Sequence, residues 1–167
     1  MSFISRRFHA GVAAAGLIAA LASSAADPAF AAGPFRPFLG NWRGTGEITA
    51  MDGRKEPISC RATYEGGDDD QSLSQTLVCA SDAFRLNIES NAVAEQGGLR
   101  GEWRETTRGV QGTLSGSIGG GVFEGTIDGG GFTARILLRS NGRKQAVSIQ
   151  PSAGDIRSVD LMLTRSK

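Results

Sequence analysis

Histidine and cysteine carry much of the metal-binding, nucleophilic and proton-transfer chemistry of proteins, and this sequence holds few of either. Among 167 residues there is one histidine, His9, and there are two cysteines, Cys60 and Cys79. His9 lies in a segment that we expect to be removed, which leaves no histidine for a haem site, a zinc site or a Ser-His-Asp triad. We therefore find no catalytic constellation, and we expect neither an enzyme nor a bound metal or cofactor.

The charged side chains do not form a reactive set either. Glu102 and Glu105 fall on opposite faces of one predicted strand, so the two carboxylates cannot cooperate. Three arginines lie near them in the sequence: Arg100, Arg104 and Arg108. Recognition of an anion is one interpretation of these arginines. Because Arg100 and Arg104 share the outward face with Glu102, surface ion pairs are the simpler one.

The first 31 residues have the features of a secretory signal peptide. Arg6 and Arg7 form a short basic region, an apolar run follows over residues 10–22, and Ala29-Phe30-Ala31 matches a small-x-small cleavage site. We predict cleavage after Ala31 and export by general secretion to the periplasm or beyond the cell. The apolar run is too short to span about 30 Å of hydrocarbon, so we expect no membrane span after leader removal.

The mature chain is balanced in charge. The full sequence has 18 basic and 17 acidic side chains, and removal of Arg6, Arg7 and Asp27 with the leader leaves 16 of each. Such a surface lacks the concentrated basic charge on which nucleic-acid binding depends. We expect no nucleic-acid partner. We expect a monomer whose partner is a small apolar ligand or a protein of the cell envelope.

From Asn41 onward, apolar and polar residues alternate in short runs separated by glycine-rich or Asn/Asp turns. This pattern predicts ten strands, over residues 42–50, 56–65, 72–79, 83–90, 98–107, 110–118, 122–128, 132–140, 144–150 and 156–165. Their even spacing predicts an all-β fold, an antiparallel up-and-down barrel, with a β-sandwich as the alternative. We assign residues 32–40 to an N-terminal lead-in and residues 41–167 to a single barrel domain.

Alternation also predicts which face of each strand is buried. Within residues 110–118, Val110, Leu114 and Ile118 share one face, while Thr113 and Ser115 point the other way. An apolar inner face and a polar outer face are typical of a sheet wrapped around an apolar interior. An outer-membrane barrel, which needs an apolar outer band, is less favoured.

The two cysteines agree with one particular hairpin. If residues 56–65 and 72–79 pair, residues whose numbers sum to 139 lie opposite one another, and Cys60 and Cys79 meet that condition. Both thiols then point to the apolar face. In an oxidising compartment this predicts a Cys60–Cys79 disulfide, the alternative being two free buried thiols.

The first strand is introduced by the sequence Leu39-Gly40-Asn41-Trp42-Arg43-Gly44-Thr45-Gly46. Its Gly-x-Trp, ahead of a meander of strands, resembles the opening motif of the calycin superfamily, which includes lipocalins and avidins. The whole run looks most like that of nitrobindin-type barrels, which also have about ten strands. The resemblance implies a barrel in which Trp42 plugs one end. It does not extend to haem binding, because the mature chain lacks the histidine that ligates haem in nitrobindins.

Aromatic residues of the predicted strands are candidates to line a ligand pocket: Trp42, Tyr64, Phe84, Trp103 and Phe123. The inner face also carries five glycines: Gly46, Gly101, Gly112, Gly116 and Gly125. These glycines either relieve the bending of a small barrel and let aromatic rings pack over bare backbone, or leave space for a ligand. The sequence thus predicts an exported lipocalin-like protein that binds a small apolar or amphipathic ligand. The alternative is a non-catalytic structural or interaction module of the cell envelope with a filled core.

Overall fold

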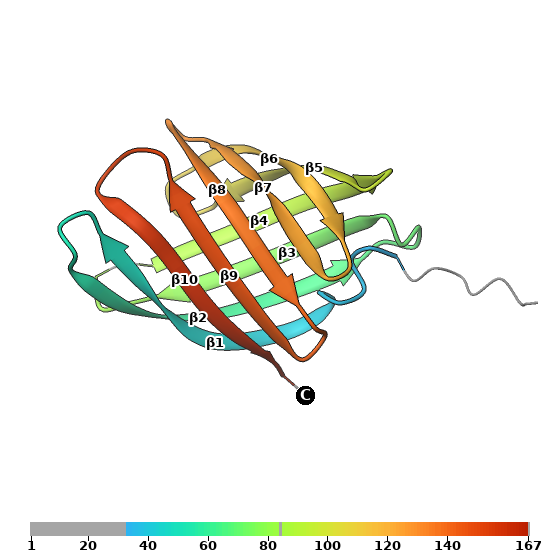
Figure 1. The fold of residues 1–167 in the computed structure, drawn as a ribbon, viewed down its shortest axis with the longest axis horizontal. Helices are drawn as coiled ribbons and strands as arrows, with labels where there is room; N and C mark the ends of the chain where they lie inside the picture. The colour runs from blue at the N-terminus through green and yellow to red at the C-terminus, as the bar shows by residue number, and fades with distance from the viewer. Residues whose placement is uncertain (1–32, 84, 167) are drawn as a thin grey trace, which may run out of the picture. The chain divides into compact units, whose positions relative to one another are not determined.

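The computed structural model describes residues 33–83 and 85–166. The predicted signal peptide, with its cleavage site at Ala31, lies outside these residues. Ten strands make up the fold (Figure 1). Their bounds are β1 Gly40–Ala50, β2 Lys55–Gly66, β3 Ser72–Ala80, β4 Arg85–Glu95, β5 Gly98–Glu105, β6 Val110–Gly119, β7 Val122–Gly129, β8 Phe132–Ser140, β9 Lys144–Pro151 and β10 Ile156–Arg165.

The strands close into one antiparallel barrel. Each strand pairs with the next along the chain, and β1 pairs with β10, which joins the two edges of the sheet. The predicted up-and-down barrel is therefore confirmed, and the sandwich alternative is wrong. Within residues 33–83 and 85–166, no helix has the length and apolar character needed to cross a membrane.

The β2–β3 hairpin has the predicted register. Cys60 lies opposite Cys79 and Ala62 lies opposite Leu77. The sulfur atoms of the two cysteines are bonded, and both residues are buried on the inner face, which confirms the disulfide. The bridge joins residues 19 positions apart. By the chain-entropy model a cross-link of this span contributes about 3 kcal/mol to stability.

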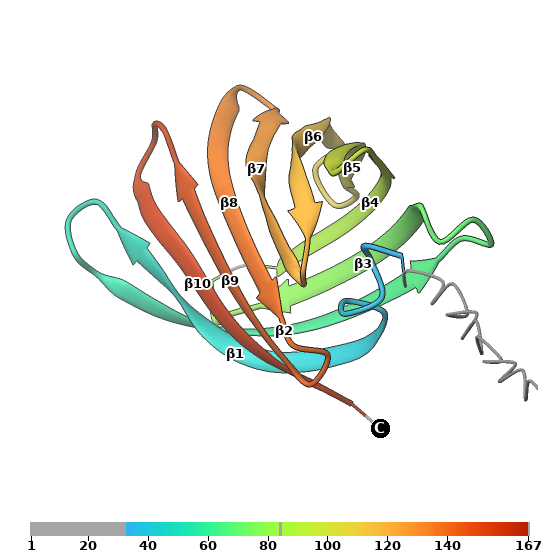
Figure 2. The same cartoon turned by 45° about the vertical axis from the view of Figure 1, so that its right-hand side comes forward.

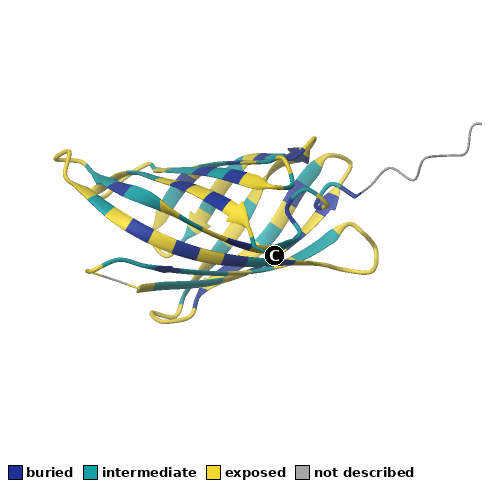
Figure 3. Ribbon diagram, turned by 90° about the horizontal axis from the view of Figure 1, so that it is seen from below, coloured by how far each residue is buried: buried dark blue, intermediate teal, exposed yellow. Residues whose placement is uncertain are grey.

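Burial alternates along the strands as the inner and outer faces require (Figure 3). In β2, Ile58, Cys60, Ala62 and Tyr64 are buried, and the residues between them are exposed or half-buried. The same alternation continues around the barrel, so the apolar side chains form one interior core. The predicted assignment of faces is confirmed.

Among the strands that extend beyond their predicted bounds, β4 does so by the most residues. β4 continues past the predicted end at Ser90, with Ala92 and Ala94 buried on the inner face. The turn into β5 consists of Gln96 and Gly97, whose φ angles of 52° and 80° are those of a tight hairpin turn. Alanine contributes little to a hydrophobic pattern, which is why alternation alone ended this strand too early.

The lead-in covers the barrel end at which β1 begins. Phe35 and Phe38 are each 2% exposed and pack in the core. The indole nitrogen of Trp42 donates a hydrogen bond to the carbonyl of Phe38 at 2.6 Å, and Trp42 is itself fully buried. Trp42 thus lies at the closed end of the barrel, which is the position that the resemblance to lipocalin-like barrels implies.

The inward glycines lie where neighbouring strands approach closely. A Cβ atom at Gly112 would overlap the carbonyl oxygen of Asp128, and one at Gly125 would overlap that of Ser115. The other three behave in the same way toward carbonyls of adjacent strands: Gly46, Gly101 and Gly116. Figure 2 shows how tightly the sheet curls around β5 and β6, next to several of these positions. The glycines therefore serve the curvature of the barrel.

We expect Gly112→Ala to destabilise the protein, because the added methyl group must push β6 away from β7. Overpacking of this kind lowers the free energy of unfolding by about 1–3 kcal/mol. Gly119→Ala is the matched control, since it lies in the same strand and a Cβ atom there meets nothing within 4 Å. Urea denaturation should show a change below about 0.5 kcal/mol for the control. Equal stability of the two variants would contradict this role of Gly112.

Candidate functional site

The barrel encloses a cavity of about 500 Å³, a volume typical of small-molecule pockets. All ten strands contribute to its wall, together with Phe35 and Phe38 of the lead-in. The wall is mainly aliphatic and aromatic, with residues such as Ile48, Leu77, Leu114, Phe123, Ile136 and Leu161. The interior of the barrel is thus a mainly apolar cavity.

The cavity is not made by the inward glycines. The five glycines that relieve strand curvature are absent from its wall: Gly46, Gly101, Gly112, Gly116 and Gly125. The space arises because side chains of medium size, projecting from a ten-stranded perimeter, do not fill the barrel axis. Of the two explanations of these glycines, the relief of bending is therefore the one that their positions support.

The cavity opens at the barrel end opposite the lead-in. There, Phe132 at the start of β8 and Ile156 at the start of β10 line the cavity and are 38% and 39% exposed. Arg108 in the β5–β6 turn also lines it, and its side chain is half-exposed. A ligand entering from solvent would pass this partly apolar rim.

Four residues interrupt the apolar wall as one row across β2, β3, β4 and β5. The register pairs Tyr64 with Gln75, Gln75 with Ser90, and Ser90 with Trp103. All four line the cavity. Because directly opposite residues of paired strands project to the same face, their polar groups form a continuous strip along the wall. We call Tyr64, Gln75 and Ser90 the polar row.

Hydrogen bonds link the members of the polar row. The hydroxyl of Ser90 donates to Oε1 of Gln75 at 2.7 Å, and Nε2 of Gln75 donates to the hydroxyl of Tyr64 at 3.5 Å. The indole N–H of Trp103 donates instead to the backbone carbonyl of Asp128 at 3.3 Å. Burial raises the pKa of Tyr64 well above its ordinary value of 10.0, and the hydrogen bond from Gln75 offsets this only in part. The row is therefore uncharged at neutral pH.

Glu105 lines the mouth of the cavity, but its carboxylate is hydrogen-bonded to backbone N–H groups at and beside the β5–β6 turn. It is 4% exposed, and its carboxylate accepts backbone N–H bonds from Asn87 at 3.1 Å, Thr107 at 3.1 Å and Arg108 at 2.6 Å. Burial alone would raise the pKa of Glu105, but these hydrogen bonds lower it from 4.5 to about 2. The same bonds turn the chain, which is why β5 ends at Glu105 and not at the predicted residue 107.

The arginines near β5 do not form one anion site. Arg104 pairs with Glu89 at 2.6 Å and Arg100 with Glu95 at 3.2 Å, all with exposed side chains. The prediction of surface ion pairs is thus confirmed. Their partners lie on β4 and not at Glu102, because cross-strand neighbours come closer than residues of the same strand.

Three of the five predicted ligand residues line the cavity: Tyr64, Trp103 and Phe123. Trp42 does not line it and packs at the closed end, where the guanidinium carbon of Arg165 lies 4.8 Å from its ring centre. Phe84 lies outside the described residues. That these aromatic residues bind a ligand stays a prediction.

Sequence reasoning missed the polar members of the wall. For Gln75 a signal existed, because the register that joins the cysteines also sets Gln75 opposite Tyr64 on the inner face. Ser90 stood at the predicted end of its strand, so it had no assigned partner. Arg108 belongs to a turn, where alternation says nothing about direction.

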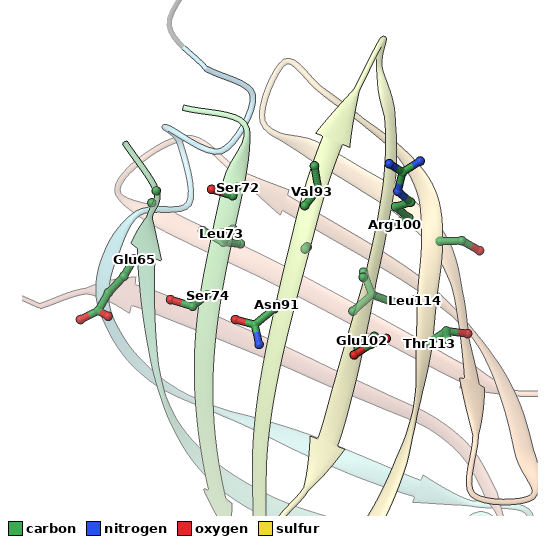
Figure 4. Close-up of a pocket in the computed structure, with 15 residues that line it drawn as sticks. Glu65, Ser72, Leu73, Ser74, Asn91, Val93, Arg100, Glu102, Thr113 and Leu114 are labelled. Carbon is green, nitrogen blue, oxygen red and sulfur yellow. The ribbon is translucent and has the colours of Figure 1, made fainter. Parts of the chain in front are cut away.

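A second depression, of about 760 Å³, lies on the outer face over β2 to β6 (Figure 4). Ser74, Asn91, Glu102 and Thr113 cross it as successive partners on neighbouring strands. Most of its lining residues are exposed, among them Glu65, Arg100 and Glu102. It is an open depression on the outer face, so the interior cavity, whose wall comes from all ten strands, is the stronger candidate for a ligand site.

No protein-family model matches the sequence, and no curated protein matches it. Among solved structures, Rv2717c from M. tuberculosis has a TM-score of 0.64 at 16% identity, over 78% of this chain and 94% of that chain. The S-type phycobiliprotein lyase CPES from Guillardia theta has a TM-score of 0.55 at 12% identity, over 80% and 90%. These similarities concern the fold. They show that the closed ten-stranded barrel of this chain resembles these two structures in fold.

We expect Glu105→Gln to change how stability depends on pH. The pKa of Glu105 is about 2 in the folded protein and returns to 4.5 on unfolding, so its stabilising effect is complete above pH 4.5 and is lost as the pH falls toward 2. The variant should have a lower Tm at pH 7 and should lose less of its Tm than the wild type across that window. Circular dichroism measures both quantities.

Glu102→Gln, on the outer face of the same strand, is the control for Glu105→Gln and should follow the wild type. If all three proteins lose Tm in parallel between pH 4.5 and 2, the carboxylate of Glu105 does not hold the turn.

Proposed function

We propose that this barrel binds a small apolar or amphipathic molecule in its interior. The observation that carries the proposal is the cavity of about 500 Å³, with its aliphatic and aromatic wall and its partly exposed rim. Wall atoms that face the cavity have few neighbours with which to make dispersion contacts. An apolar ligand that moves from water into the cavity supplies these contacts. The fold similarity to a phycobiliprotein lyase fits a ligand-binding barrel.

The competing hypothesis, a structural or interaction module, requires a filled core. The cavity argues against that hypothesis, because a barrel that serves only as a scaffold gains stability when larger side chains fill its interior. Binding is therefore the function that the geometry supports best.

We also propose that the protein acts in the periplasm or outside the cell, after cleavage at Ala31. The Cys60–Cys79 disulfide supports this location, since disulfides persist in oxidising compartments. The leader carries the basic, apolar and small-x-small features of a signal peptide.

Titration with N-phenyl-1-naphthylamine, an uncharged apolar fluorophore, tests the binding function. Trp103 lines the cavity and Trp42 does not, so the two tryptophans should report differently. We expect saturable quenching of the intrinsic fluorescence in the wild type and in Trp42→Phe, and loss of most of that quenching in Trp103→Phe. The emission of the bound probe should rise in all three proteins.

Quenching that disappears in Trp42→Phe and persists in Trp103→Phe would place the probe outside the cavity. An absence of saturable binding in the wild type would contradict the proposed function itself.

A further inference from the structure

The polar row has hydrogen-bond donors to spare. Ser90 and Tyr64 each carry one hydroxyl hydrogen, and the amide of Gln75 carries a pair. The bond from Ser90 to Gln75 and the bond from Gln75 to Tyr64 use one hydroxyl hydrogen and one amide hydrogen. Among the hydrogen bonds between residues 33–83 and 85–166, the Tyr64 hydroxyl appears as an acceptor and not as a donor, and the Gln75 amide donates to Tyr64 alone.

These spare donors lie where an unmet hydrogen bond is expensive. Tyr64 is 5% exposed, Gln75 is half-buried, and the wall around them is mainly aliphatic. A buried donor without an acceptor keeps its full desolvation cost, and native proteins rarely tolerate one without a reason. The row belongs to three adjacent strands in direct register, so its side chains cannot all turn outward. Its donors therefore point to an acceptor that a ligand supplies.

The acceptor that fits is an uncharged oxygen. Among the described residues that line the cavity, the charged ones are Glu105 and Arg108, and both belong to the turn at the mouth. A carboxylate or phosphate held at the polar row would be buried without a counter-charge, at a cost that neutral hydrogen bonds do not repay. A carbonyl oxygen has two lone pairs and can accept from both Tyr64 and Gln75.

We propose that the barrel binds an apolar molecule bearing an uncharged carbonyl group, whose oxygen accepts hydrogen bonds from the Tyr64 hydroxyl and the Gln75 amide. This inference rests on the proposed function and adds the class of ligand: a ketone or ester, not a hydrocarbon or a free acid. Ser90 is a positioning residue, because its bond to Oε1 of Gln75 orients the amide N–H groups.

Matched ligands separate the carbonyl group from the apolar body. Decane, 2-decanone and decanoate are each used to displace bound N-phenyl-1-naphthylamine, which gives a dissociation constant for each ligand. The ratio of the constants of decane and 2-decanone is then compared between the wild type and Tyr64→Phe. Because the variant keeps the aromatic ring, its affinity for decane should not change, and decane serves as the internal reference. Loss of one neutral hydrogen bond should shift the ratio by about fivefold against the ketone.

The outcomes distinguish the ligand class from the binding function. Displacement by both ligands with an unchanged ratio would overturn the carbonyl assignment and leave the cavity as a binding site. Tighter binding of decanoate than of 2-decanone by the wild type would overturn it in favour of an anionic ligand. Displacement by none of the three would overturn the proposed function and the carbonyl assignment together.

Gln75→Leu provides a second variant that keeps the test decisive if Tyr64→Phe does not fold. It removes the other spare donor, and we expect the same direction of change in the ratio, with folding checked by far-UV circular dichroism. An unchanged ratio in this variant would also overturn the carbonyl assignment.

Discussion

Pairing between β1 and β10 is the interaction on which the rest of the structure depends. These strands come from the two ends of the described chain, and their ladder runs from Trp42 opposite Arg165 to Ala50 opposite Ile156. Once the sheet is closed, every second residue of every strand faces one common interior, whatever its chemistry. Tyr64 and its row partners are buried for this reason, and the composition of the inner face decides what the barrel can hold.

Closure imposes two demands that different residues meet. Neighbouring strands must approach closely where the sheet curls, and Gly112, Gly116 and Gly125 permit that approach because a Cβ atom there would overlap backbone. The interior must also be either filled or left as a site. The aliphatic side chains of ten strands leave about 500 Å³ unfilled, with the lead-in phenylalanines at one end and a partly exposed rim at the other.

Local pattern was enough to predict the strands, their inner faces and the register at Cys60 and Cys79, because alternation and turn chemistry act between residues close in sequence. It failed where the signal was weak or distant. Ala92 and Ala94 gave too little hydrophobic contrast to extend β4. The size of the cavity could not be predicted, because its volume depends on how side chains from all ten strands meet across the barrel.

The occupancy of the interior can be seen directly in a crystal soaked with 1-bromodecane and measured at the bromine absorption edge. A binding cavity predicts an anomalous peak inside the barrel, in the space bounded by Trp103 and Phe123 and closed by Phe38. A crystal with no peak inside the barrel, or with bromine only in the outer depression over β2 to β6, would contradict a ligand site in the interior.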